Sequence, residues 1–79
     1  MNLRIYQAVK SGKSDNSIRF SAFQSLVVDL GFTFLGQEGS HITYFHYAVK
    51  EFMNIQPSKG KAKGYQVRQL RAIINKHNL

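Results

Sequence analysis

The chain has 79 residues, of which 43% are apolar, and it contains no cysteine. It is therefore too short for a second domain, apolar enough to form a modest core, and unable to form a disulfide framework or a zinc ribbon. Eleven Lys and Arg residues against four Asp and Glu residues give a formal net charge of +7, which favours a polyanionic partner such as nucleic acid. No apolar run reaches the ~20 residues of a membrane helix, so we expect no membrane insertion and a single cytoplasmic domain over residues 1–79.

Two helices are predicted in the first part of the chain. Residues 1–16 read as a short helix with apolar residues on one face, followed by a polar loop. Apolar residues then recur at helical spacing over residues 20–30. Ser21 followed by Gln24 has the form of a capping box at the start of this helix, and Gly31 supplies a stop at its end.

Three strands are predicted next, because the following segments are rich in aromatic and β-branched residues. Residues 32–35 alternate, and residues 42–47 are joined to them by a hairpin-length connection that contains glycine. A third strand over residues 51–55 would place Met53 and Ile55 on one face and the residues between them on the other.

The C-terminal part combines a basic loop with an amphipathic helix. Pro57 precedes a loop over residues 58–64, and apolar residues at helical spacing then predict a last helix with Arg68 and Arg71 turned outward. The predicted class is therefore α+β, in the order α-α-β-β-β-α. A three-stranded antiparallel sheet would carry the helices on one face and leave the other face open for a partner.

Four short motifs follow one another in a fixed order: Gly31-Phe32, Gly39-Ser40-His41, a basic loop that begins after Pro57, and Gly64 before an arginine-bearing helix. This ordered set resembles the HicA family of toxins from toxin–antitoxin systems. The resemblance runs from about Phe20 to the C-terminus. It implies a fold similar to the double-stranded RNA-binding domain, with residues 17–79 as the core and residues 1–16 as an N-terminal extension found in some members.

The same resemblance implies an activity and a partner. HicA toxins are endoribonucleases that act on messenger RNA, and a HicB-like antitoxin holds them inactive. One residue departs from the family pattern, because many members have a second histidine immediately before the proline, where this chain has Gln56. This chain therefore has no histidine at that position to fill the role of the second one.

His41 is the candidate catalytic residue. RNA carries its own nucleophile, the 2′-hydroxyl, so cleavage needs only groups that remove one proton and supply another, and no cofactor. Histidine suits both tasks because its ordinary pKa of about 6.5 lies near neutrality. Gly39 would let the backbone pass close to a phosphate, and Ser40 could bind a phosphate oxygen or orient the imidazole. The expected products are a 2′,3′-cyclic phosphate and a 5′-hydroxyl.

Basic side chains after Pro57 are candidates for binding RNA phosphates. Lys59, Lys61 and Lys63 could neutralise the phosphates at and beside the cleaved bond, and Arg68 follows on the last helix. A solvated, mobile loop is the alternative interpretation of the lysines.

The remaining histidines and aromatic residues have simpler interpretations. His46 would face away from His41, because five residues separate them along one strand, and we interpret it as structural. His77 is expected to fray with the C-terminal tail. Four aromatic residues could stack on unpaired bases or belong to the sheet core: Tyr44, Phe45, Tyr47 and Phe52.

Two other functions stay open. The four acidic residues and three histidines form no metal-ligand spacing and no nucleophilic triad, so neither site is predicted. A non-catalytic RNA-binding module on the same scaffold would bind RNA without any dependence on His41. A small DNA-binding protein would bind duplex DNA in a salt-sensitive manner, also independently of His41.

Overall fold

The computed structural model describes residues 1–79. The helices are α1 (Leu3–Ser11), α2 (Phe20–Asp29) and α3 (Gly64–His77). The strands are β1 (Thr33–Glu38), β2 (His41–His46), β3 (Glu51–Ile55), β4 (Pro57–Ser58) and β5 (Lys61–Ala62). The predicted α+β class with a three-stranded antiparallel sheet is confirmed, whereas the short β4–β5 hairpin lies where only a loop was expected.

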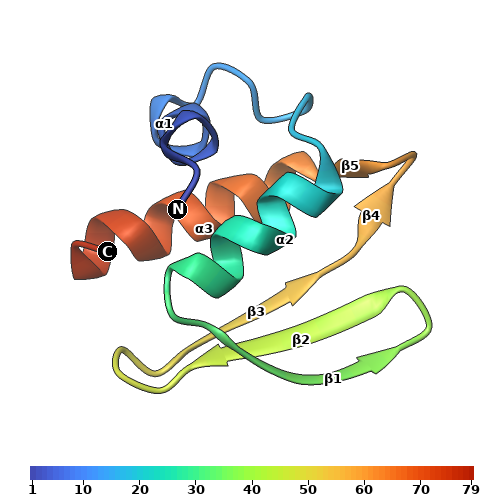
Figure 1. Ribbon diagram of the computed structural model, residues 1–79, viewed down its shortest axis with the longest axis vertical. Coiled ribbons are helices and arrows are strands. Elements are labelled where there is room, and N and C mark those ends of the chain that lie inside the picture. Colours follow the sequence, from blue (N-terminus) through green and yellow to red (C-terminus); the bar gives the residue numbers. More distant parts are fainter.

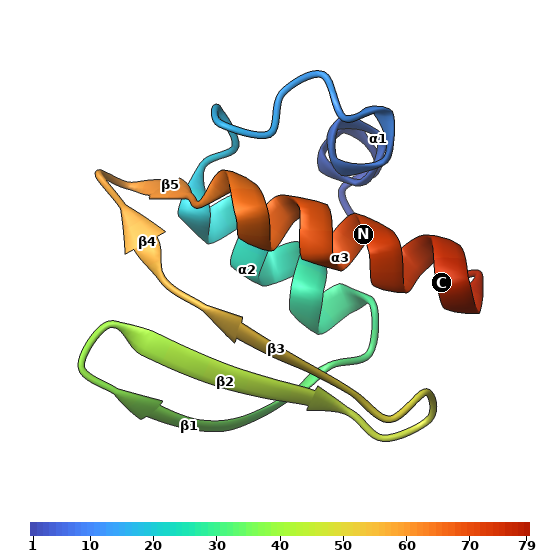
Figure 2. The same cartoon turned by 180° about the vertical axis from the view of Figure 1, so that it is seen from behind.

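The elements form layers. β1, β2 and β3 pair in that order, and α2 and α3 cover one face of their sheet (Figure 1). α1 lies on the far side of these two helices, as the view from behind also shows (Figure 2). No element covers the opposite face of the sheet, so that face is open. None of the three helices has both the length and the apolar character needed to cross a membrane.

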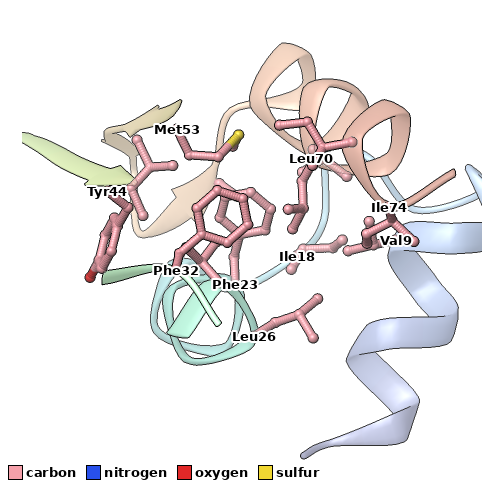
Figure 3. Packing of buried hydrophobic residues seen from close by; sticks show 14 of the residues in the cluster. Val9, Ile18, Phe23, Leu26, Phe32, Tyr44, Met53, Leu70 and Ile74 are labelled. Atoms are coloured by element: carbon pink, nitrogen blue, oxygen red, sulfur yellow. The ribbon is translucent and has the colours of Figure 1, made fainter. Parts of the chain in front are cut away.

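The core lies between the sheet and the helices. Tyr44 of β2, Met53 of β3, Phe23 of α2 and Leu70 of α3 belong to one buried cluster (Figure 3). Residues of β2 and β3 alternate between buried and more exposed positions, which is the pattern of a sheet covered on one face only. Val9 of α1 belongs to the same buried cluster, so the N-terminal helix shares the core of the rest of the chain.

The capping box predicted for the second helix is wrong. α2 begins at Phe20, one residue before Ser21, and no side chain caps it. The Phe20 N–H instead donates to the backbone oxygen of Gly60 (2.9 Å), and Arg19 forms a β-bridge with Lys61. Backbone of the β4–β5 hairpin therefore satisfies a donor that a capping side chain would otherwise satisfy. The predicted stop is confirmed, since Gly31 follows the helix with φ of +104°.

Arg71 does not point outward as predicted. Its guanidinium donates to both carboxylate oxygens of Asp15 at 3.0 Å, and to the backbone oxygen of Val9 at 3.0 Å. These bonds hold the pKa of Asp15 below its ordinary value. Arg71 thus attaches the N-terminal segment to α3, whereas Arg68 is exposed as predicted.

The C-terminal end of α3 does not fray as expected, because a side-chain contact attaches it to β3. His77 lies within the helix rather than in a frayed tail, and its Nε2 is 2.7 Å from Oε2 of Glu51. This hydrogen bond lowers the pKa of Glu51. This contact is absent from the sequence interpretation because its partners are 26 residues apart.

Candidate nucleic-acid interface

A tight turn places His41 at the edge of the open sheet face. β1 and β2 are connected by Gly39 and Ser40 alone, and Glu38 pairs with His41 across the turn. Gly39 has φ of +60°, a conformation that glycine adopts without the steric cost of a side chain. Ile42 is buried toward the helices, so His41, the preceding residue, lies on the opposite face and is exposed.

A chain of hydrogen bonds joins this turn to the start of α3. The Gln56 side-chain amide donates from Nε2 to Ser40 Oγ (3.0 Å) and accepts at Oε1 from Lys63 Nζ (2.9 Å). The Gln56 backbone N–H donates to Oε1 of the buried Gln66 (3.1 Å), which fixes where Gln56 stands. One glutamine therefore holds the Lys63 ammonium close to the turn that carries His41.

The lysine-rich segment after Ile55 forms a β-hairpin of β4 and β5, and not the irregular loop that was expected. Lys59 and Gly60 have φ of 53° and 78° at the centre of a two-residue turn, and Ser58 pairs with Lys61 across it. The hairpin borders an open hollow of about 430 Å³. The residues that line this hollow are Asn16, Ser58, Lys59, Lys61, Ala62, Lys63, Gly64 and Tyr65. A second hollow, of about 360 Å³, is lined by Ser17, Arg19, Lys59, Gly60 and Lys61.

The predicted site residues fall into two connected groups. Gly39, Ser40 and His41 form the turn, and the Gln56 amide connects that turn to Lys63. Lys63 also lines the first hollow together with Lys59 and Lys61. None of the three lysines forms a salt bridge, because every ion pair of the structure lies elsewhere. The hollow is therefore a concentration of uncompensated positive charge.

Arg68 lies beside the first hollow, next to Gly64. It is exposed on α3, and a Cβ built on Gly64 would lie 3.3 Å from its Nη1. Gly64 lines the hollow, so the Arg68 guanidinium lies beside the rim of the hollow.

His46 is built into the fold. Its Nε2 is 2.9 Å from the backbone oxygen of Leu30, and its Nδ1 accepts from the Val49 N–H (3.4 Å). The ring also packs edge-on against Phe32, with ring centroids 5.1 Å apart. A side chain at position 31 would meet Nε2 at 2.8 Å, so Gly31 is needed there for space as well as for its positive φ. No three His, Asp or Glu side chains cluster closely enough to hold a metal ion.

Sequence reasoning missed several residues of this region. Gln56 was noted only as a departure from a family pattern, and its bridging role depends on the sheet register, which brings residue 56 next to His41 beyond the Ile42–Ile55 pair. Asn16, Arg19 and Tyr65 line the hollows but carry no sequence signal of their own. The two-residue turn of the hairpin, Lys-Gly between short extended segments, was the one local signal that could have been found.

Comparisons with protein-family models, with curated proteins and with solved structures found no match for this chain.

Proposed function

We propose that this protein is a metal-independent endoribonuclease that uses His41 as its catalytic residue. The observation that carries the proposal is the hydrogen-bonded chain from Ser40 through Gln56 to Lys63, which joins an exposed histidine to a basic hollow. A phosphodiester that reaches both groups would meet a proton-transfer group and a fixed positive charge, the two components that metal-free RNA cleavage needs.

The proposed reaction is an internal transesterification of RNA. The His41 imidazole takes the proton of the 2′-hydroxyl as its oxygen forms a bond to the adjacent phosphorus. The bond from phosphorus to the 5′-oxygen breaks, and the imidazolium returns the proton to that oxygen. The products are a 2′,3′-cyclic phosphate and a 5′-hydroxyl. Lys63 stabilises the charge that develops on the phosphate oxygens, and Gln56 keeps its ammonium in place.

The resemblance to HicA toxins supports three further parts of the proposal. The chain would be the toxin of a type II toxin–antitoxin system, with messenger RNA as its substrate. An acidic HicB-like antitoxin would inhibit it by covering His41 or the lysine hairpin. The order of helices and strands supports a fold similar to the double-stranded RNA-binding domain.

Purified wild-type protein and His41→Ala should be incubated with RNA in the presence of a metal chelator. We expect the wild type to cleave and to leave 2′,3′-cyclic phosphate ends, and His41→Ala to be about 10²–10⁴-fold slower. The matched control is His77→Gln, which removes a histidine that contacts Glu51 far along α3 and should keep full activity. Induced expression of each variant would extend the comparison to growth arrest.

Two results would overturn the proposal. Equal cleavage by wild type and His41→Ala would remove His41 from the reaction. RNA binding by the wild type with no cleavage would favour the non-catalytic RNA-binding module instead.

A further inference from the structure

The open sheet face carries an aromatic cluster that the core does not use. In β2, His41, Thr43 and Phe45 alternate with the buried residues and therefore share the open face. Phe52 of β3 pairs with Phe45 across the strands, and their ring centroids are 4.5 Å apart. Tyr47, directly after β2, packs edge-on against Phe45 at 4.7 Å. Phe45, Tyr47 and Phe52 together form an aromatic platform.

The platform presents ring surface to solvent. Phe52 is 59% exposed and Tyr47 is 63% exposed, although aromatic rings of this size favour burial. Tyr44, by contrast, points to the helix side, is buried, and has its hydroxyl bonded by Gln24 Nε2 (3.0 Å). The four aromatic residues of this region thus separate into one core residue and three platform residues.

The platform is continuous with the proposed catalytic residue. Phe45 follows His41 by four residues on the same face of one strand, which is a distance of ~13 Å at the usual strand rise. Between them lies the cross-strand pair of Thr43 and Asn54, whose polar side chains share this face and could bind base edges. A strand of RNA held at His41 can therefore extend over polar groups and onto the aromatic rings.

Charge favours a polyanion as the occupant of this face, and the exposed rings favour a nucleic acid among polyanions because its bases can stack on them. The chain has a net charge of +7. Lysines flank the face at both ends, with exposed Lys50 in the β2–β3 turn and Lys63 beside the turn that carries His41. Glu38, opposite His41, is the one acidic residue that the register places on this face.

We propose that the aromatic platform binds unpaired nucleobases next to the cleaved phosphate, so that the substrate is single-stranded RNA. Bases in a duplex are stacked on each other and offer no free ring face, whereas unpaired bases stack on exposed aromatic side chains. This inference rests on the proposed ribonuclease function, but its test measures binding rather than cleavage.

The test uses His41→Ala, which leaves RNA intact, as the parent protein. Fluorescence anisotropy would measure the affinity of a short unstructured RNA for the parent and for the same protein with Phe52→Ala. We expect Phe52→Ala to weaken binding about tenfold, within the range that base stacking contributes. The salt dependence should not change, because the ring carries no charge. The same RNA annealed to its complement should bind both proteins equally.

Phe34→Ala is the matched control. Phe34 is also an exposed phenylalanine of the sheet, at 55%, but it pairs with Tyr44 and so lies toward the other face. The Phe34→Ala variant should bind RNA with the same affinity as the parent. An oligonucleotide of the same length without bases should not distinguish Phe52→Ala from the parent. Thermal unfolding of each variant would show that the fold is intact.

The outcomes separate this inference from the ribonuclease proposal. Unchanged affinity on Phe52→Ala, or an equal loss on Phe34→Ala, would overturn the platform even if the wild type cleaves RNA. A tenfold loss specific to Phe52→Ala would support the platform even if no cleavage occurs. Sedimentation equilibrium that shows a dimer broken by Phe52→Ala would also overturn it, because a second copy of the chain would then occupy the face.

Discussion

In the middle and at the C-terminal end of α3, basic side chains contact acidic ones, whereas around its N-terminal end basic side chains gather without acidic partners. Arg71 contacts Asp15, and Lys76 and His77 contact Glu51. Lys59, Lys61 and Lys63 surround an open hollow and form no ion pair. Net charge alone therefore does not locate a binding surface. The cations that remain uncompensated after folding are the ones available to a polyanion.

The largest effect on stability is expected at Arg71. Arg71→Ala removes the donor of two bonds to Asp15 and one to Val9, and it leaves a partly buried carboxylate unpaired. We expect the free energy of unfolding to fall by about 2–3 kcal/mol, which lowers the Tm by about 10–20 °C in a domain of this size. Urea unfolding and calorimetry would measure both. Arg68→Ala, the control on an exposed position of α3, should change stability by about 0.5 kcal/mol or less. An equal loss in the two variants would mean that the contact with Asp15 contributes nothing to stability.

The three lysines that line the first hollow should show the opposite behaviour. Replacing Lys59, Lys61 and Lys63 with glutamine should leave stability nearly unchanged but weaken RNA binding. The slope of log affinity against log salt concentration should become shallower by about 2, because three phosphate contacts on single-stranded RNA are lost.

The control for the lysine variant has the same net charge. It replaces Lys10, Lys13 and Lys76, which lie away from the hollow, with glutamine. A titration of RNA binding at several salt concentrations would compare the two triple variants. If both lower the slope equally, the hollow has no special role and the charge acts as a whole.

The smallest expected effect is the loss of folding stability at acidic pH. Hydrogen bonds from Arg71 and His77 lower the pKa values of Asp15 and Glu51, respectively. In the unfolded chain the two groups titrate near about 3.9 and 4.3, so the unfolded state binds more protons on acidification. Their stabilisation is present above that range and is lost as the pH falls through the lower pKa values of the folded state. Urea unfolding from about pH 5 to about pH 2 should show this loss, and Arg71→Ala should show a shallower decline. A decline of the same steepness in both proteins would contradict the assignment to Asp15.

Sequence reasoning succeeded where the information is local. The helical spacing in residues 20–30, the alternation in residues 51–55 and the stop at Gly31 all depend on neighbours along the chain, and each is confirmed. The capping box failed because the backbone N–H of Phe20 donates to the backbone oxygen of Gly60, which lies far away in the sequence.

The same limit explains what was missed at the candidate site. The outward position of Arg71 was wrong because Asp15 lies 56 residues away in sequence. The bridging role of Gln56 required both the register of β2 and β3 and the position of Lys63 at the start of α3. His41 and the lysines were selected by residue type and by a family resemblance, whereas the bonds that bring them together are long-range.

The contacts of the buried His46 help to keep His41 on the open face of the sheet. His46 is fixed by Leu30 and Val49, and Gly31 leaves just enough room for its ring. Side chains in a strand alternate, so a slip of β2 by a single residue would bring His41 inward and expel His46 from its place. The bonds of His46 penalise that slip. Together with the buried Ile42 and Tyr44, the imidazole that takes no part in the proposed reaction thereby fixes which side of the sheet the reactive one faces.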